Sequence, residues 1–412
     1  MLEGWGSLRA VCHRAALATV LLCLSTVSHG ASPRINSASS CEGGGEFCDR
    51  SSWFDREVAF DNDFVTRLYD HLQETKQRWH VPLGIGAWHW YHEDLVGSND
   101  GYGIEGLRGT YWWFVTADPT YELSRDTAIG GHLEYRLRDG DPFRSFFPDN
   151  FWSYEAYGYL RSAEHGTLKA GQIWKRFGLD WDGVFFGNAP YFDGFKLDPD
   201  YGVSWERSRS LDENLTLDTF VQFFVHEDGV NGSFGGADAE SVPGFNERNT
   251  LVLRAVPNLS LGEDRSLAIG VSGFVGEIDS SRTDVASQNT TAYAVDVTYT
   301  SGRWRVFGEG LQSFGIINPA RYVSGGPSNR ITGFLCGTDY DFGPMTSRLI
   351  YSATIDDNPH AMQNLVVLSN TIAVTKNVDF YLEYVNHQVS GNAANPHVEF
   401  FNSLEFVIYW HF

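Results

Sequence analysis

The segment spanning residues 177–200 combines the side chains that could select a solute. Carboxylates and aromatic rings alternate closely in it: Asp180, Asp182, Asp193, Asp198 and Asp200, with Trp181, Phe185, Phe186, Tyr191, Phe192 and Phe195. Carboxylates in a narrow, partly dry passage favour cations and repel anions. Aromatic rings beside hydrogen-bonding acids also suit sugars, whose C–H faces stack while their hydroxyl groups pair. The segment predicts a selective constriction; the alternative is a loop whose rings pack against a wall while its acids face water.

Basic side chains precede this segment in the sequence. They are Lys169, Lys175 and Arg176 close to it, and Arg136 and Arg138 further upstream. We expect these five to supply a basic wall opposite the carboxylates. The predicted constriction and selectivity residues are therefore these five together with Asp180, Trp181, Asp182 and Asp193.

Signals for catalysis or for a bound metal are weak. His89 and His92 are three residues apart, and on a strand this spacing places them on opposite faces, against a shared metal. The sequence has neither a Gly-x-Ser-x-Gly elbow nor an HExxH motif. Residues 227–247 carry carboxylates that could hold calcium or bridge lipopolysaccharide, but without a fixed ligand spacing a solvated loop is favoured. We expect no enzyme, no metal and no other cofactor.

The elements that must position these residues follow a period of two. In residues 292–299, one face carries Tyr293, Val295, Val297 and Tyr299, and the other carries Ala292, Ala294, Asp296 and Thr298. Residues 378–384 and 132–138 repeat the alternation. An aromatic residue at each end of the apolar face is typical of a strand that crosses a bilayer between interfacial girdles. A soluble sandwich would place the polar face outside, so the alternation alone leaves the orientation open.

Such strands are predicted along most of the chain. They lie near 83–92, 107–117, 127–138, 151–162, 166–176, 201–209, 215–226, 248–260, 266–276, 290–300, 303–313, 330–338, 346–355, 364–374, 377–387 and 397–412. The count is about sixteen, with fourteen or eighteen still open, and single-chain bacterial barrels have even numbers. Short links alternate with long ones such as 177–200, 227–247 and 314–329, as at the two rims of a transmembrane barrel. The predicted fold class is all-β, a transmembrane antiparallel β-barrel over residues 83–412.

The chain ahead of the barrel is predicted to have two parts. Residues 1–30 read as a cleaved export signal, because two arginines precede a short apolar run and small residues follow it. Residues 31–82 read as a leader followed by a helix from Asp63 to about Trp79. Cys41 and Cys48 could form a disulfide in an oxidising compartment.

Composition excludes two classes of protein. The 412 residues carry a formal net charge of −22, and no basic stripe is visible, so a nucleic-acid partner is not expected. Beyond the N-terminus no apolar run reaches the roughly 18 residues that a transmembrane helix needs. A helical membrane bundle is therefore ruled out.

The C-terminus carries the most specific pattern. Its apolar residues fall at every second position and end on an aromatic ring: Leu404, Phe406, Ile408, Trp410 and Phe412. This pattern resembles the C-terminal signature of outer-membrane barrel proteins, which the barrel-assembly machinery reads. With the export signal, the resemblance implies the outer membrane of a Gram-negative cell.

Residues 154–160 and 168–178 resemble the paired strands of substrate-type bacterial porins, the carbohydrate-selective and phosphate-selective groups. In those proteins a Gly-Gln segment, here Gly171-Gln172, leads into a loop that folds toward the pore. The predicted N-terminal helix also resembles the periplasmic helix of the carbohydrate-selective group. The resemblance implies that residues 177–200, after the fifth strand, constrict a pore. Few clustered lysines and arginines are present, which argues against a phosphate channel.

These observations favour a porin for passive diffusion of small hydrophilic solutes, with sugars or small cations preferred. Its expected partners are outer-membrane lipid, lipopolysaccharide and the barrel-assembly machinery, as either a homotrimer or a monomer. The alternative is a secreted soluble β-rich protein, of propeller or sandwich type, that binds carbohydrates or cleaves glycosides. A third hypothesis is an adhesin or assembly scaffold with a closed lumen. The asymmetric rims, the lack of a blade-like repeat and the C-terminal pattern favour the porin.

Overall fold

The computed structural model describes ten stretches of the chain, and their regular secondary structure is all β-strand. The stretches are residues 79–92, 108–124, 126–139, 151–179, 200–226, 245–280, 287–315, 330–356, 362–390 and 400–411. The predicted export signal, the leader with its two cysteines and nearly all of the predicted helix lie outside them. Within these stretches, no helix has the length and apolar character needed to cross a membrane.

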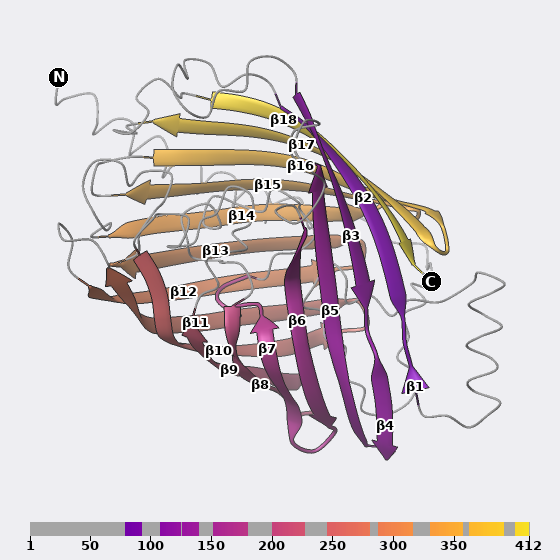
Figure 1. The fold of residues 1–412 in the computed structure, drawn as a ribbon, viewed down its shortest axis with the longest axis vertical. Helices are drawn as coiled ribbons and strands as arrows, with labels where there is room; N and C mark the ends of the chain where they lie inside the picture. Colours follow the sequence, from indigo (N-terminus) through magenta and orange to yellow (C-terminus); the bar gives the residue numbers. More distant parts are fainter. Residues whose placement is uncertain are drawn as a thin grey trace. The chain divides into compact units, whose positions relative to one another are not determined.

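The strands follow one another along the chain (Figure 1). They are β1 (Trp79–His80), β2 (Leu83–His92), β3 (Arg108–Ala117), β4 (Thr120–Ser124), β5 (Thr127–Asp139), β6 (Phe151–Ser162), β7 (Gly166–Ile173), β8 (Asp200–Asp212), β9 (Leu215–His226), β10 (Phe245–Gly262), β11 (Arg265–Ser280), β12 (Gln288–Ser301), β13 (Trp304–Phe314), β14 (Ile331–Asp341), β15 (Met345–Asp356), β16 (Met362–Thr375), β17 (Val378–Ser390) and β18 (Phe400–His411).

These strands form one closed antiparallel sheet. From β5 to β18 each strand pairs with the next, and β18 pairs back with β2, with Trp410 opposite Ile85. Strands β3 and β4 share one position beside β5, interrupted at Asp118 and Pro119, and a second proline, Pro82, separates β1 from β2. Proline lacks the N–H that a strand ladder needs, which explains why the strand is interrupted at each of these two residues. The described segments therefore make a sixteen-stranded closed barrel, as predicted.

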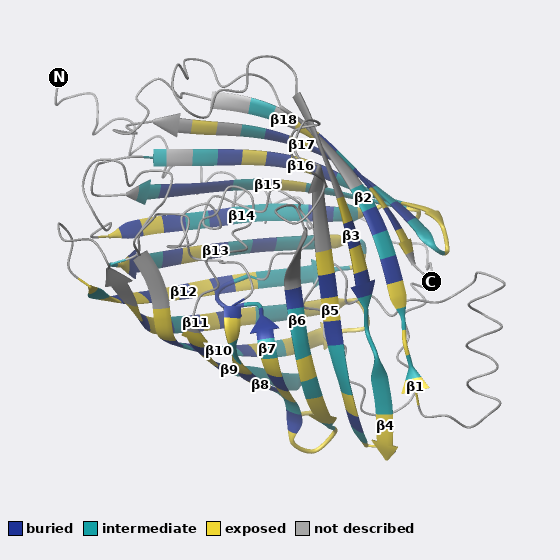
Figure 2. Ribbon diagram, in the orientation of Figure 1, coloured by how far each residue is buried: buried dark blue, intermediate teal, exposed yellow. Residues whose placement is uncertain are grey.

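The two faces of the barrel differ in chemistry. Along β12 the exposed positions are Tyr293, Val295 and Val297, whereas Ala294 and Asp296 between them are buried. Figure 2 shows the same alternation of buried and exposed residues along most strands. Large apolar side chains from almost every strand lie exposed on the outer face, and polar side chains are buried on the inner face. This is the arrangement of a barrel whose outside meets lipid.

The predicted strand positions are largely confirmed, with two corrections. The fifth predicted strand, 166–176, ends at Ile173, because the backbone after it leaves the wall of the barrel. Trp79, predicted to end a helix, belongs to β1, where it pairs with Tyr121 of β4 and packs on that ring at 4.9 Å between centroids. The propeller and sandwich alternatives are wrong, because the chain forms one closed sheet.

Candidate functional site

A glycine allows β7 to pack closely on β6 just before the chain turns inward. Gly171 has φ 140°, and a Cβ there would lie 2.3 Å from the carbonyl oxygen of Ala156 on β6. A side chain at this position would therefore collide with the neighbouring backbone. The strand continues for two residues and ends at Ile173, which is buried.

The next residues, Trp174–Leu179, form what we call the inward segment, which lies on the inner face of the barrel. The backbone N–H of Arg176 donates to Oε1 of Gln222 on β9 (2.6 Å), and Nε2 of Gln222 donates to the carbonyl of Trp174 (2.9 Å). Further on, the N–H of Gly178 donates to Oγ of Ser272 on β11 (3.1 Å). The N–H of Leu179 donates to Oε2 of Glu309 on β13. Successive bonds to alternate strands show that the segment runs across the wall, not along one strand.

The aromatic ring of Phe177 anchors the middle of the inward segment. Its side chain is 2% exposed and meets the ring of Phe274 edge-on, with centroids 5.0 Å apart. The surrounding cluster includes Phe224, Leu311 and Ile331 from three further strands. Burying a phenylalanine side chain contributes roughly 1.5–3 kcal/mol. This apolar anchor and the hydrogen bonds on either side of it hold the segment in one place.

Gly178 permits the last turn of the inward segment. Its φ is 70°, in the left-handed region where glycine is favoured. A Cβ at this position would lie 2.1 Å from Oε2 of Glu309, the oxygen that accepts from Leu179. The contact between the segment and β13 therefore depends on a residue without a side chain.

A buried ion pair on the barrel wall supports the inward segment. The guanidinium of Arg254 on β10 binds the carboxylate of Asp296 on β12 through two hydrogen bonds of 2.6 and 3.1 Å. The same guanidinium donates to Oγ of Ser272 (2.8 Å), which also accepts the N–H of Gly178. Two hydrogen bonds in a planar fork fix direction as well as charge. The ion pair thus orients a group that holds the segment.

Three of the predicted cations lie near the start of the inward segment. Nζ of Lys169 is 3.1 Å from Glu206, and Nζ of Lys175 is 2.8 Å from Asp200. The guanidinium of Arg176 lies over the ring of Phe220, 5.8 Å from its centroid. The structure brings these three cations together, but each of the two lysines is paired with a carboxylate of β8.

The remaining predicted selectivity residues are not described as side chains. Arg136 and Arg138 belong to β5, but their side chains lie outside the described set. Asp180, Trp181, Asp182 and Asp193 fall in the undescribed stretch after the inward segment. The full constriction therefore stays a prediction.

The inner face carries an excess of negative charge. Among the described residues, the buried carboxylates are Glu134, Glu155, Asp200, Glu206, Asp296, Glu309, Asp339, Asp379, Glu383 and Glu405. The buried lysines and arginines in the same set are Lys169, Lys175, Arg176 and Arg254. Carboxylates thus outnumber basic side chains at these positions, which favours cations inside the barrel.

This excess is sharpest on the wall formed by β16, β17, β18 and β2, which we call the acidic wall. None of these four strands contains a lysine or an arginine. Glu383 and Glu405 lie directly opposite each other across β17 and β18, and Asp379 is buried on the same face of β17. Like charges at directly opposed positions repel.

The predicted C-terminal signal lies on the outer face. Leu404, Ile408 and Trp410 are exposed, and Phe406 is partly so, whereas Glu405 and Val407 between them are buried. Phe412 lies outside the described residues. Recognition of this strand by an assembly machinery stays a prediction.

Sequence reasoning missed the residues that hold the inward segment. These are Gln222, Ser272 and Glu309, three polar residues on three separate strands. Period-two alternation would have placed each of them on the inner face, but it places many other polar residues there too. Only the closed sheet shows which of them meet the segment.

Comparison with known proteins identifies the fold but no sequence relative. No protein-family model matches the chain, and no curated protein matches it. The outer membrane channel DcaP of Acinetobacter baumannii superposes with a TM-score of 0.58 at 14% identity, covering 81% of this chain and 97% of that one. OmpF of Salmonella typhi, in complex with daunomycin, gives 0.57 at 11% identity over 82% and 98% of the two chains. The anion-selective porin of Comamonas acidovorans gives 0.54 at 11% identity over 81% and 100%. The fold is thus that of outer-membrane porins, as the resemblance implied.

Proposed function

We propose that this protein is an outer-membrane porin, a channel for passive diffusion of small hydrophilic solutes with a preference for cations. The observation that carries the proposal is the inward segment, held across the inner wall of a closed barrel whose outer face is apolar. Barrels of sixteen strands leave room for an aqueous channel. A segment fixed inside such a barrel narrows it and sets which solutes pass.

The outer face supports placement in a membrane. Exposed aliphatic and aromatic side chains recur along the strands, for example Val271 and Val275 on β11 and Leu349 on β15. In water such a surface would be costly to expose, whereas lipid chains match it. Membrane lipid is therefore the partner of this face. Lipopolysaccharide, the assembly machinery and association into a homotrimer are further elements of the proposal.

The charge of the inner face supports cations as the preferred solutes. The buried carboxylates among the described residues outnumber the buried lysines and arginines, and the strands of the acidic wall contain no lysine or arginine. A passage lined in this way concentrates cations and excludes anions. The proposal that sugars also pass rests on the aromatic rings and carboxylates of residues 177–200.

Channel activity is tested by single-channel recording in a planar bilayer under a KCl gradient. We expect stable open steps and a reversal potential of the sign set by cations. Gln222→Ala removes both side-chain bonds that hold the start of the inward segment, so its conductance should exceed that of the parent protein.

The matched control is Gln312→Ala, the same substitution on β13, where the side chain bonds Tyr293 and Thr332. This variant should conduct like the parent. Silence from protein that is folded and inserted would exclude a channel, and equal conductance in both variants would exclude constriction by the inward segment.

A further inference from the structure

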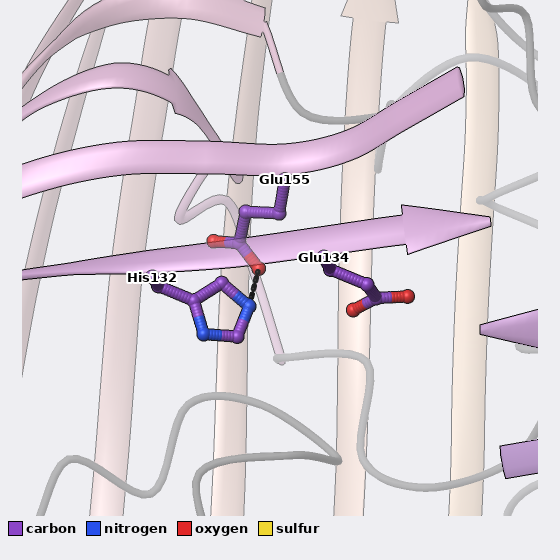
Figure 3. A group of neighbouring side chains, drawn as sticks. All are labelled: His132, Glu134 and Glu155. Atoms are coloured by element: carbon purple, nitrogen blue, oxygen red, sulfur yellow. Dashed lines mark ion pairs between the residues drawn. The ribbon is translucent and has the colours of Figure 1, made fainter. Parts of the chain in front are cut away.

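A histidine and two glutamates meet on the inner face of β5 and β6 (Figure 3). Glu134 and Glu155 are directly paired across the two strands, and His132 lies two residues before Glu134, on the same face. All three are buried, and one ligand atom from each lies within 4.8 Å of the others.

Two neighbouring side chains set the orientation of the His132 imidazole. Nδ1 of His132 is 2.5 Å from Oδ1 of Asp118, the residue at the break between β3 and β4. The ring of Tyr157 stacks on the imidazole, with centroids 5.5 Å apart. A carboxylate on Nδ1 keeps a proton there, which is the usual support of a histidine that binds metal, and a metal ion would take the place of a proton at Nε2.

The other ring nitrogen faces a carboxylate at a distance too long for a hydrogen bond. Nε2 of His132 is 3.6 Å from Oε2 of Glu155 and, within the described residues, makes no hydrogen bond. The side chain of His132 is 3% exposed, so water does not supply one freely. A tetrahedral ion with bonds of about 2.1 Å would place two ligand atoms about 3.4 Å apart, close to this separation.

We propose that His132, Glu134 and Glu155 bind a divalent transition-metal ion of the zinc type. One imidazole nitrogen and two carboxylate oxygens are three ligands of the kind that such an ion takes in proteins. Asp118, which holds the Nδ1 side of the ring, is the positioning residue. The ion would also offset the negative charge of the carboxylates around it.

Zinc binding by the full chain tests this proposal. The protein, refolded in detergent and freed of metal by a chelator, is titrated calorimetrically with Zn²⁺. We expect one tight site, an affinity at least 100-fold weaker in His132→Gln, and one 10- to 100-fold weaker in Asp118→Asn, since supporting carboxylates have effects of that size. His165→Gln alters an exposed histidine in the turn after β6 and should bind like the parent.

Two further measurements keep the result decisive. Folding of each variant is checked by its heat-dependent mobility in gel electrophoresis, and Glu155→Gln replaces His132→Gln if the latter does not fold. Co²⁺ in place of Zn²⁺ should give visible absorption in the parent and lose it in the variants. Absence of tight binding in the parent, or equal binding in folded His132→Gln or Glu155→Gln, would show that these three residues do not form a metal site. These readouts do not depend on conductance.

Discussion

Two parts of the inner wall use charge in opposite ways. We call the strands β7–β13 the paired wall. On it Lys169 meets a carboxylate on the neighbouring strand, Arg254 meets one on the second strand along, and Lys175 of the inward segment meets Asp200 of β8. On the acidic wall, Glu383 and Glu405 oppose each other without a lysine or arginine in any of its strands. The inward segment lies against the paired wall, where Ser272 and Glu309 accept its N–H groups.

The difference indicates a division of tasks. Paired charges have little net field, but their hydrogen bonds fix geometry, which suits a wall that must hold a segment in place. Charges of one sign cost stability, because they repel each other, yet they create the field that selects ions. Removing a charge should therefore destabilise the paired wall and stabilise the acidic wall.

The largest effect is expected from Asp296→Asn on the paired wall. The side chains of Arg254 and Asp296 are 6% and 3% exposed, so the variant leaves a buried guanidinium without its carboxylate. Breaking a buried pair in this way costs about 3–5 kcal/mol of unfolding free energy. Urea unfolding of the refolded protein in lipid vesicles measures the change.

Asp264→Asn, in the exposed turn between β10 and β11, is the control and should unfold like the parent. A loss below 1 kcal/mol in Asp296→Asn would mean that the pair does not support the inner wall. The comparison between the two walls would then lose its basis.

Sequence analysis predicted the strands of both walls but not the ion pair between Arg254 and Asp296. Alternation of side chains is local, so it located sixteen strands and assigned Asp296 to the face opposite Val295 and Val297. The partner, Arg254, is 42 residues away, and only the register of β10, β11 and β12 brings them together. The end of β7 at Ile173 was missed for the same reason, because Gln222 and Ser272, which hold the next residues, come from distant strands.

On the acidic wall the expected effect is smaller and has the opposite sign. Glu405 is 1% exposed, and among the described residues neither of its carboxylate oxygens has a hydrogen-bond partner. Glu405→Gln removes the carboxyl group that faces Glu383, so the unfolding free energy should rise by about 0.5–1 kcal/mol. In a planar bilayer the reversal potential of this variant should also move toward zero.

The control for this variant is Glu213→Gln, which changes an exposed glutamate in the turn between β8 and β9. It should alter neither unfolding nor reversal potential. If Glu405→Gln lowered stability instead, the carboxylate would be supporting the wall, and the distinction drawn between the two walls would be wrong.

The smallest effect is expected from an exposed ion pair on two strands of the paired wall. Arg248 on β10 and Glu277 on β11 are 3.6 Å apart, and their side chains are 45% and 48% exposed. Exposed pairs are screened by water and salt, so a double-mutant cycle with Arg248→Gln and Glu277→Gln should give a coupling of about 0.2–0.5 kcal/mol. The cycle is needed because Glu277 also accepts a hydrogen bond from Asn249, which single variants would disturb. The contrast with Arg254 on β10 and Asp296 on β12 depends on burial. A coupling above 1 kcal/mol at the exposed pair would show that burial does not set the strength of ion pairs here, and the large effect assigned to Asp296 would need another cause.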